Sequence, residues 1–301
     1  MVSVEQLPSV ALVILTWNQK DTTLKCLESL KACDYTNLTV ILVDNGSEDG
    51  TSDCVIRSYP NVVLLRNEEN EGASAGRNTG IEYANMHISY SYIMFIDNDT
   101  EVRPDFLTKL VESLETCEDS RVQIASPMIY QIGTEKTIDS AGGSRVNFFT
   151  GSTQTRGHGE LDKGQYQHKI FSRSVPTTAV ILHKKAMERA GSYDVSFDPY
   201  GYEDLDMVLR ANKKNTPYLF VPNSIVYHLG SRTGFKTYSN EYAATKGKNM
   251  RRFFKRHSTP FQWVCFNVLL PFLSIKTIAR ELSKGNVRTV WALAKGFFRG
   301  L

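Results

Sequence analysis

The chain has 301 residues, of which 41% are hydrophobic and 22% charged, the balance of an ordinary folded protein with room for one large or two modest cores. Its net charge of +3 is uneven, because residues 241–301 hold twelve Lys or Arg and two Glu, while the first 240 residues carry a net −7. The five cysteines are scattered without CxxC spacing, which argues against a disulfide framework. A secretory leader is not recognisable either, so we expect reduced thiols and a cytoplasmic protein.

The first half of the chain alternates apolar strands with helices. Strands are predicted at 10–15, 38–43, 62–65 and 92–96, with helices at 21–32 and 73–84, the first of them capped by Asp21. Strands that are apolar throughout and alternate with helices favour a parallel sheet covered on both faces. Ligands of such sheets bind beyond the carboxyl ends of the strands, so polar residues at those ends are the first candidates for function.

Two carboxylates end the fourth strand. Asp97 and Asp99 follow the apolar run, with Asn98 between them. Two such groups repel each other unless one is protonated or a cation lies between them, and a divalent ion that holds phosphate oxygens meets this need. Taken alone, the triplet is explained more simply as an acidic turn.

Polar residues also follow the second strand, where Asp44 and Asn45 are placed to hydrogen-bond a base or a ribose. A nicotinamide cofactor is not favoured, because the later glycines neither follow the first strand nor match GxGxxG spacing: Gly72, Gly76 and Gly80. Glycines before and inside a helix are expected to admit a ligand close to the backbone. Arg77 between them is equally well explained as a phosphate partner or as an ion pair with an acid.

From residue 122 on, short strands alternate with Gly-rich turns, which we interpret as a looser half that forms an acceptor pocket. The short strands are predicted at 122–125, 128–131 and 170–171. Clearer elements are a strand at 178–182 and a helix at 184–190 that Gly191 ends. A further strand ends in His228. A lone histidine is more often structural than a ligand, but strand ends in this chain repeatedly supply groups that suit a metal.

Three acids open a helix after a Tyr-Gly-Tyr loop: Glu203, Asp204 and Asp206. The helix dipole favours an acid at this end, which explains one of them but not three. Asp206 lies among apolar neighbours and is expected to pair with a basic side chain. Glu203 and Asp204 are expected to face a cleft.

Six short segments occur in a fixed order: Leu-Thr-Trp-Asn at 15–18, Val-Asp-Asn-Gly-Ser at 43–47, Asn-Glu-Gly through Gly-Arg-Asn-Thr-Gly-Ile at 70–81, Asp-Asn-Asp at 97–99, Tyr-Glu-Asp-Leu-Asp at 202–206 and Val-Tyr-His at 226–228. Together they resemble the inverting glycosyltransferases of family 2. The branch they resemble most contains the rhamnosyl- and galactofuranosyltransferases of bacterial surface-polysaccharide assembly, which share the Ala-Gly-Gly and late Tyr-His pieces.

This resemblance implies an α/β fold of the GT-A (Rossmann-like) type, with a mostly parallel sheet, helices on both faces and a C-terminal helical extension. The glycosyltransferase domain would span 1–240, with a donor half at about 1–120 and an acceptor half at about 121–240, and the tail 241–301. It also implies a site for the donor nucleotide that includes Thr16, Asn18, Asp44, Asn45, Arg77, Asp97 and Asn98. A divalent ion, Mg²⁺ or Mn²⁺, would be held by Asp99 and His228, with Asp97 bound to it directly or through water.

The same resemblance implies that Asp204 is the general base, with Glu203 beside it. An inverting transfer needs a base for the acceptor hydroxyl and a cation at the leaving diphosphate, and a carboxylate bound to a metal is a poor base. Two separate acidic sites fit both needs. The implied reaction moves a sugar of the rhamnose or galactofuranose type from a UDP- or dTDP-sugar to a lipid-linked or growing polysaccharide. The chain lacks a Gln-x-x-Arg-Trp segment, so we expect non-processive transfer.

Two other functions are compatible with such a sequence. A non-catalytic relative that binds a nucleotide or a carbohydrate would share the scaffold, although it would not need a separate base. A nucleotidyltransferase would need a basic, Gly-rich triphosphate loop after the first strand, and residues 16–19 do not provide one.

The basic tail is the last feature. Residues 261–275 are apolar but contain polar residues and a proline, and they are shorter than the ~20 residues of a spanning helix. Basic residues then recur against apolar and aromatic ones: Lys276, Arg280, Lys284, Arg288, Lys295 and Arg299 against Ile275, Ile278, Leu282, Val290, Trp291, Phe297 and Phe298. We favour amphipathic helices on the inner face of the cell membrane over helices packed on the domain. Nucleic acid is not expected as a partner, because no binding motif accompanies the charge.

Overall fold

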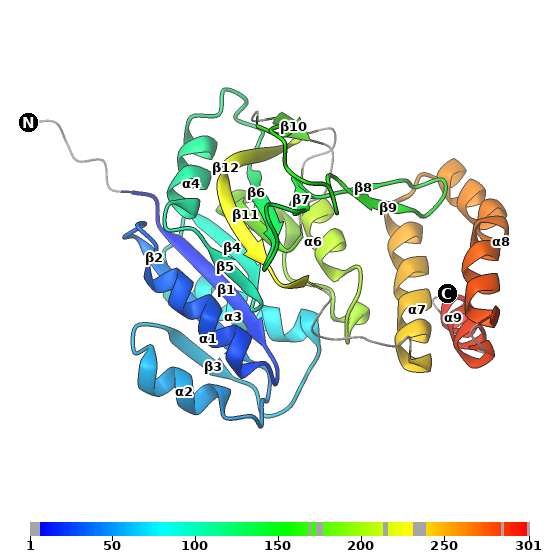
Figure 1. Ribbon diagram of the computed structural model, residues 1–301, viewed down its shortest axis with the longest axis horizontal. Coiled ribbons are helices and arrows are strands. Elements are labelled where there is room, and N and C mark those ends of the chain that lie inside the picture. The colour runs from blue at the N-terminus through cyan, green and yellow to red at the C-terminus, as the bar shows by residue number, and fades with distance from the viewer. Residues whose placement is uncertain are drawn as a thin grey trace, which may run out of the picture.

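The structure is a computed structural model that describes residues 7–167, 170–172, 177–212, 216–230, 239–283 and 286–299. A curled sheet with its helices forms the body of the molecule, and three C-terminal helices lie at one end of it (Figure 1). The 10-stranded sheet has the order β10-β12-β6-β11-β4-β1-β2-β3, with β5 beside β12 and β7 beside β6.

The first half of the chain forms the parallel sheet that the sequence predicts. The strands are β1 (Val10–Thr16), β2 (Leu38–Asp44), β3 (Val63–Arg66) and β4 (Tyr92–Asp97), and the helices are α1 (Lys20–Lys31), α2 (Thr51–Ser58) and α3 (Ala73–His87). The pairs β1–β2, β1–β4 and β2–β3 are parallel, and Thr16 lies opposite Asp44 while Leu15 lies opposite Asp97. This register brings the polar strand ends to one edge, as expected.

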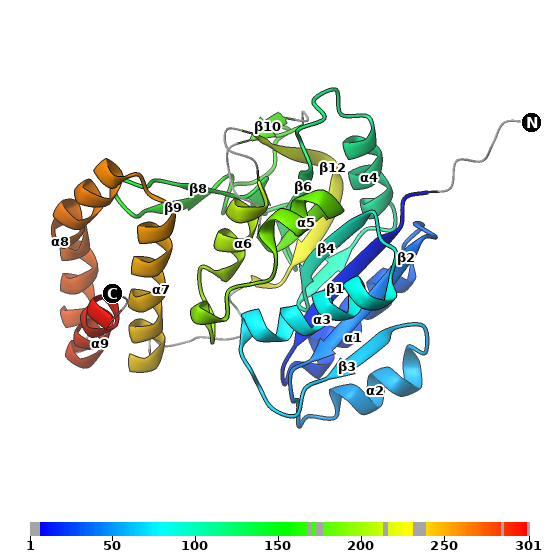
Figure 2. The ribbon, with the colours of Figure 1, turned by 180° about the vertical axis from the view of Figure 1, so that it is seen from behind.

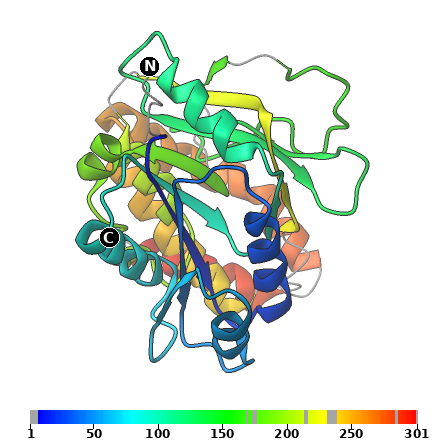
Figure 3. The same ribbon diagram turned by 90° about the vertical axis from the view of Figure 1, so that its left-hand side faces the viewer.

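Helices cover both faces of the sheet. Side chains of α1, α2 and α4 (Phe106–Glu115) pack on one face with Leu12 and Ile14, whereas α3, α5 (Lys184–Ala190) and α6 (Glu203–Ala211) pack on the other with Ala11 and Val13. Alternate residues of β1 therefore belong to separate cores, which is why the strand is apolar throughout. Figure 3 shows the sheet between these helices.

The second half adds mainly antiparallel pairs. Its strands are β5 (Thr100–Val102), β6 (Ile124–Gln131), β7 (Ile138–Ala141), β8 (Ser144–Val146), β9 (Thr153–Thr155), β10 (Ile170–Ser172), β11 (Ala179–His183) and β12 (Tyr218–His228), with a 3-10 turn at Val195–Phe197. The pair β6–β12 is parallel, but β11 runs antiparallel to β4 and β6, and β5, β7 and β10 are also antiparallel to their neighbours. The parallel arrangement thus holds for β3-β2-β1-β4 and for β6-β12.

Some element boundaries differ from the predicted ones. The two short strands expected at 122–131 are one strand, β6, and the shift in register between β6 and β12 lies directly after Pro127, which cannot donate a ladder hydrogen bond. Helix α1 starts at Lys20 with Gln19 as its N-cap, so Asp21 lies in the first turn and does not cap it. Helices α2 and α4 were not predicted. Asp49 precedes α2, and its carboxylate accepts hydrogen bonds from the amide and the hydroxyl of Thr51, the first residue of the helix.

The C-terminal helices are α7 (Asn240–His257), α8 (Pro260–Ser283) and α9 (Val287–Arg299). They share an aromatic core with the body: Phe197, Phe253, Phe254, Phe266 and Phe297. Helix α9 lies beside α7 and α8 (Figure 2). The α7–α9 contact depends on Gly247 and Gly296, because a Cβ on either would overlap the opposite backbone. Within the described ranges, every helix is too short or too polar to cross a membrane.

Candidate metal centre and acidic site

Three side chains at the carboxyl edge of the sheet form a cluster that suits a metal ion. Asp97 ends β4, Asp99 lies in the turn to β5, and His228 ends β12, which pairs with β5 so that His228 faces Thr100. The Nε2 of His228 lies 3.2 Å from Asp99 Oδ1 and 4.0 Å from Asp97 Oδ2. One ligand atom from each residue lies within 4.8 Å of the others. Two carboxylates and one imidazole are a donor set that fits Mn²⁺ well and Mg²⁺ through the oxygens.

The second nitrogen of His228 is held by an acid that the sequence did not single out. Nδ1 of His228 lies 2.9 Å from Asp139 Oδ2, and both side chains are largely buried. Burial would lower the pKa of His228, but the hydrogen bonds with Asp139 and Asp99 and the charges of Asp97 and Asp99 raise it to about 10. The sequence signal for Asp139 was its place two residues before Ala141-Gly142-Gly143, which was interpreted as a Gly-rich turn and as a piece shared with the rhamnosyl- and galactofuranosyltransferase branch.

The electrostatics of Asp97 also favour a cation. Burial raises the pKa of Asp97 to about 6, and the nearby carboxylates of Asp204 and Asp99 act in the same direction, while Arg77 and His228 oppose them. The repulsion among these carboxylates thus adds to the effect of burial, which is the largest cause of the raised pKa. A divalent ion between Asp97 and Asp99 would offset this repulsion.

Arg77 connects this cluster with the acids of α6. Its Nη2 lies 3.3 Å from Asp97 Oδ1, and its Nη1 lies 3.7 Å from both Glu203 Oε1 and Asp204 Oδ1. The guanidinium is largely buried and lies 5.5 Å from the ring centroid of Tyr193. Of the two interpretations left open by the sequence, the ion pair with acids is the arrangement present in the structure.

The two acids at the start of α6 differ in exposure. The side chain of Asp204 is 27% exposed, but that of Glu203 is only 9% exposed and lies against Arg77. Burial and the charge of Asp204 raise the pKa of Glu203 to about 7, against the effect of Arg77. The prediction that Glu203 faces a cleft is therefore wrong, because its carboxylate packs inward onto the arginine.

The polar residues after β2 are buried and hold the neighbouring loops. Asp44 accepts hydrogen bonds from the Ser47 amide, at 2.8 Å, and from the Ser52 hydroxyl. Asn45 bridges to the following loop through Asn67, Asn70 and the backbone at 71–72. Both residues thus lie at the predicted edge, with their side chains already hydrogen-bonded within the protein.

A second set of polar side chains joins the end of β1 to the Asp97–Asp99 turn. The Asn98 amide donates to Thr16 Oγ1 at 3.2 Å, to Gln19 Oε1 at 3.0 Å and to Thr23 Oγ1 at 3.0 Å. Asn18 has a φ of 50° and accepts from the Glu48 amide at 2.8 Å. These contacts place Thr16 and Asn98 beside the metal cluster, whereas Asn18 is bonded to the loop that follows β2.

The glycines near α3 serve packing. An added Cβ on Gly76 would lie 2.5 Å from Leu15 Cδ1, and one on Gly80 would lie 2.5 Å from Val13 Cγ1, so α3 lies directly on β1. The Asp198 carboxylate accepts from the Ser74 amide at 2.7 Å at the start of α3. The expected approach of a ligand to these glycines is therefore not what the structure shows, because the sheet and Asp198 occupy that space.

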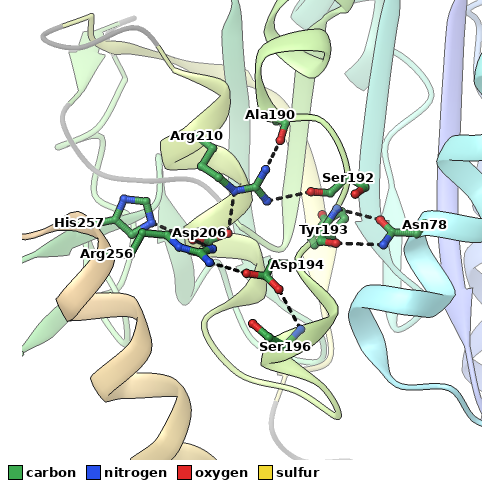
Figure 4. A network of polar contacts seen from close by, with 10 residues as sticks. All are labelled: Asn78, Ala190, Ser192, Tyr193, Asp194, Ser196, Asp206, Arg210, Arg256 and His257. Atoms are coloured by element: carbon green, nitrogen blue, oxygen red, sulfur yellow. Dashed lines mark hydrogen bonds and ion pairs between the residues drawn. The ribbon is translucent and has the colours of Figure 1, made fainter. Parts of the chain in front are cut away.

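Asp206 has the basic partners that the sequence predicts. Its side chain is fully buried and lies 2.8 Å from Arg210 Nε, 2.9 Å from Arg256 Nη1 and 2.8 Å from His257 Nε2. Arg256 also contacts Asp194 (Figure 4). This network attaches α6, which carries Glu203 and Asp204, to α7 of the C-terminal helices.

Comparison with known proteins finds two glycosyltransferases and a succinoglycan biosynthesis protein among the relatives of this chain. The chain is 26% identical over 194 residues to glycosyltransferase AglE of Haloferax volcanii, covering 62% of this chain and 56% of that protein. It is 30% identical over 136 residues to the putative glycosyltransferase EpsH of Bacillus subtilis, covering 44% and 38%. It is 32% identical over 111 residues to the succinoglycan biosynthesis protein ExoO of Rhizobium meliloti, covering 36% and 31%. The chain thus spans between about a third and just over half the length of these relatives.

Two solved structures share the fold at 16% identity. Mannosyltransferase PcManGT from Pyrobaculum calidifontis, in complex with GDP-Man and Mn²⁺, has a TM-score of 0.54 and covers 97% of this chain and 74% of that one. GalNAc-T7 with UDP, GalNAc and Mn²⁺ has a TM-score of 0.58 and covers 94% and 59%. These similarities confirm the α/β fold of the GT-A type. The family model described as glycosyl transferase family 2 matches residues 11–181, more than half of the chain, and the protein belongs to this family.

Proposed function

We propose that the protein is a metal-dependent inverting glycosyltransferase that moves a sugar from a nucleoside-diphosphate donor to an acceptor hydroxyl. The observation that carries this proposal is the presence of two acidic groups at one sheet edge, Asp97–Asp99–His228 and Asp204, joined through Arg77. A single displacement needs both of them. A protein that only binds the donor would not need the second.

On the donor side, Asp99 and His228 would hold Mn²⁺ or Mg²⁺, with Asp97 as a further ligand or a contact through water. When bound, the ion would stabilise the charge that develops on the leaving diphosphate. The nucleotide would lie against the loops that Asp44, Asn45, Thr16, Asn18 and Asn98 hold in place. Both structural neighbours contain Mn²⁺ together with a nucleotide or a nucleotide sugar, which supports this assignment.

On the acceptor side, Asp204 would act as the general base. The acceptor oxygen forms a bond to the anomeric carbon while the bond from that carbon to the diphosphate oxygen breaks, and the hydroxyl proton moves to the Asp204 carboxylate. The ion pair with Arg77 keeps the carboxylate in position. Attack opposite the leaving group inverts the anomeric configuration.

The donor sugar and the acceptor follow from sequence resemblance. We assign a UDP- or dTDP-sugar of the rhamnose or galactofuranose type, transferred without processivity to a lipid-linked or growing surface polysaccharide. The succinoglycan biosynthesis protein among the relatives supports a polysaccharide product. Screening a panel of nucleotide sugars for Mn²⁺-dependent hydrolysis tests the donor directly.

The C-terminal helices would attach the enzyme to the cytoplasmic face of a membrane. Helix α8 exposes a row of apolar side chains, and α9 exposes aromatic and basic ones: Phe261, Val264, Val268, Phe272 and Ile275, then Arg288, Trp291, Lys295 and Phe298. Aromatic residues beside lysine and arginine suit a phospholipid surface. Phe297 was expected on this face, but it is buried in the aromatic core. Lys284 and the side chains of Lys276, Arg280 and Arg299 lie outside the described residues.

Two substitutions test the separation of roles. We expect Asp204→Asn to keep Mn²⁺-dependent donor binding but to lower turnover ~10²–10⁴-fold, the usual contribution of a general base. Asp99→Asn should instead weaken the metal-dependent binding. Full turnover by Asp204→Asn would contradict the assignment of Asp204 as the base. Turnover and donor binding that are both unchanged in EDTA would contradict the proposed role of the metal. Donor binding without product from any acceptor would favour the non-catalytic alternative.

A further inference from the structure

We infer that Asp139 is a positioning residue that sets the orientation and tautomer of His228 for metal binding. This inference rests on the proposed metal site. It adds a residue 89 positions away in the chain from the histidine.

The backbone aims Asp139 at His228. Strand β7 pairs with β6, and the register passes from Tyr130↔Ile138 to Ile129↔Ser140, so Asp139 is the extra residue of a β-bulge. A bulge redirects the side chain of the extra residue and is common beside active sites. On the other side of β6, Gln131 pairs with His228. The bulge thus lets a side chain from β7 reach the last residue of β12.

The segment that carries Asp139 is fixed from both sides. The amide of Ile138 donates to Glu160 O at 2.8 Å, and the amide of Gly159 donates to Ile138 O at 2.9 Å. The side chain of Ile138 is fully buried in a core with Phe220. Asp139 is therefore anchored well enough to hold a neighbouring ring in one orientation.

The contact has a chemical consequence for the imidazole. A carboxylate only accepts hydrogen bonds, so the 2.9 Å contact from Asp139 Oδ2 selects the tautomer with a proton on Nδ1 of His228. A metal ion can then take the place of the proton on Nε2, the nitrogen that lies 3.2 Å from Asp99. A carboxylate that holds a ligating histidine in this way typically raises metal affinity 10–100-fold. Without Asp139, the ring could rotate or carry its proton on Nε2.

A second histidine provides a matched control. His158 Nδ1 lies 3.3 Å from Asp139 Oδ1, but its side chain is 59% exposed and it has no contact with Asp97 or Asp99 among the described residues. If the effect of Asp139 passes through His228, removal of His158 should leave the metal site intact.

The test is a titration of the full chain with Mn²⁺ alone. Calorimetry and the loss of the free-ion EPR signal measure the binding. We expect Asp139→Ala to weaken Mn²⁺ binding 10–100-fold. Asp139→Asn should lie between Asp139→Ala and the wild type, because its carbonyl oxygen still accepts a hydrogen bond from Nδ1–H. His158→Gln should bind like the wild type. Imidazole ¹⁵N shifts of the Mg²⁺-bound protein should show His228 protonated on Nδ1 in the wild type and a mixture of tautomers in Asp139→Ala.

The outcomes separate this inference from the proposed function. If the wild type binds Mn²⁺ and Asp139→Ala binds it equally well with a native melting temperature, the inference fails and the metal site stands. An equal loss of affinity in His158→Gln would also overturn the role given to Asp139. Should Asp139→Ala not fold, wild-type affinity and shifts in Asp139→Asn would overturn it. A wild type that does not bind Mn²⁺ would overturn both.

Discussion

At the scale of single residues, Arg77 has the most consequential position in the site. Its guanidinium is largely buried and forms ion pairs with Asp97, Glu203 and Asp204. Burial would lower the pKa of Arg77, but the charges of Asp204, Tyr193 and the other two acids raise it above its usual range. One cation thus offsets part of the repulsion among three carboxylates, and it sets the spacing between the proposed metal ligand Asp97 and the proposed base Asp204.

Removal of this cation should destabilise the fold. We expect Arg77→Met to lower the free energy of unfolding by about 3–5 kcal/mol, the cost of leaving a buried ion pair without one partner. Urea unfolding at neutral pH measures the change. The control is Arg121→Met, which removes an arginine from an exposed pair with Asp119 and should leave the midpoint nearly unchanged. Equal midpoints for the two variants would contradict the structural role of Arg77.

At the scale of elements, the position of α6 depends on α7. Asp206 on α6 is fully buried and bonded to Arg256 and His257 of α7 as well as to Arg210 of its own helix. Burial would raise the pKa of Asp206, but these hydrogen bonds outweigh it and lower the pKa. Burial would also raise the pKa of Asp194, but hydrogen bonds from Ser196 and the ion pair with Arg256 lower it to about 2. The helix that bears the proposed base is therefore attached to the C-terminal unit by charge.

These shifts predict acid sensitivity with a definite sign. A carboxyl group with a lowered pKa in the folded state stabilises the fold above its unfolded pKa of about 3.9, and this contribution is lost as the pH falls toward the folded value. For Asp194 the loss falls between about pH 4 and pH 2. We expect the free energy of unfolding to fall over this range and to fall less steeply in Asp194→Asn. If the free energy of unfolding of Asp194→Asn falls between pH 4 and pH 2 as steeply as that of the wild type, Asp194 makes no such contribution.

The elements also show which predictions a local pattern supports. The strands β1, β2 and β4 were predicted within a residue or two, because each is an apolar run that ends at polar residues. Helix α5 matches its predicted span, since Gly191 ends it with a φ of 71°. The strand β6 was predicted as two short strands, and Pro127 lies between them, where a proline normally argues against a strand. The proline is accommodated where the register between β6 and β12 shifts, and this pairing cannot be predicted from the local sequence pattern.

At the scale of the whole molecule, the C-terminal helices both complete a core and expose an apolar surface. Phe254, Phe266 and Phe297 are buried between them, so a truncation before α8 would uncover this core as well as remove the surface. Point substitutions on the exposed row of α8 are therefore the sharper test of membrane binding.

We expect Phe272→Glu to reduce pelleting with vesicles that contain anionic phospholipid. The double variant, Phe261→Glu with Phe272→Glu, should abolish it. These side chains are 71% exposed at Phe261 and 68% at Phe272, so the fold should tolerate the change. Insertion of a charge opposes burial in the lipid. The matched control is Met86→Glu, a 71% exposed residue of α3, and Figure 1 shows that α3 belongs to the body of the molecule, apart from α8. Pelleting equal to the wild type in the double variant would remove the membrane from the proposal.

The sequence by itself determined the fold class, the strand ends that carry the acids, the cluster of Asp97, Asp99 and His228 as candidates, and a basic partner for Asp206. Only the tertiary structure decided that Arg77 lies between the acids, that Glu203 turns inward and that Asp139 holds His228. The physical reason is that strand ends follow from local apolar runs, whereas these contacts join residues as distant in the chain as Asp139 and His228 or Arg77 and Asp204. They depend on the strand order, on a β-bulge and on the packing of α6 on α7, which arise only when the whole chain folds.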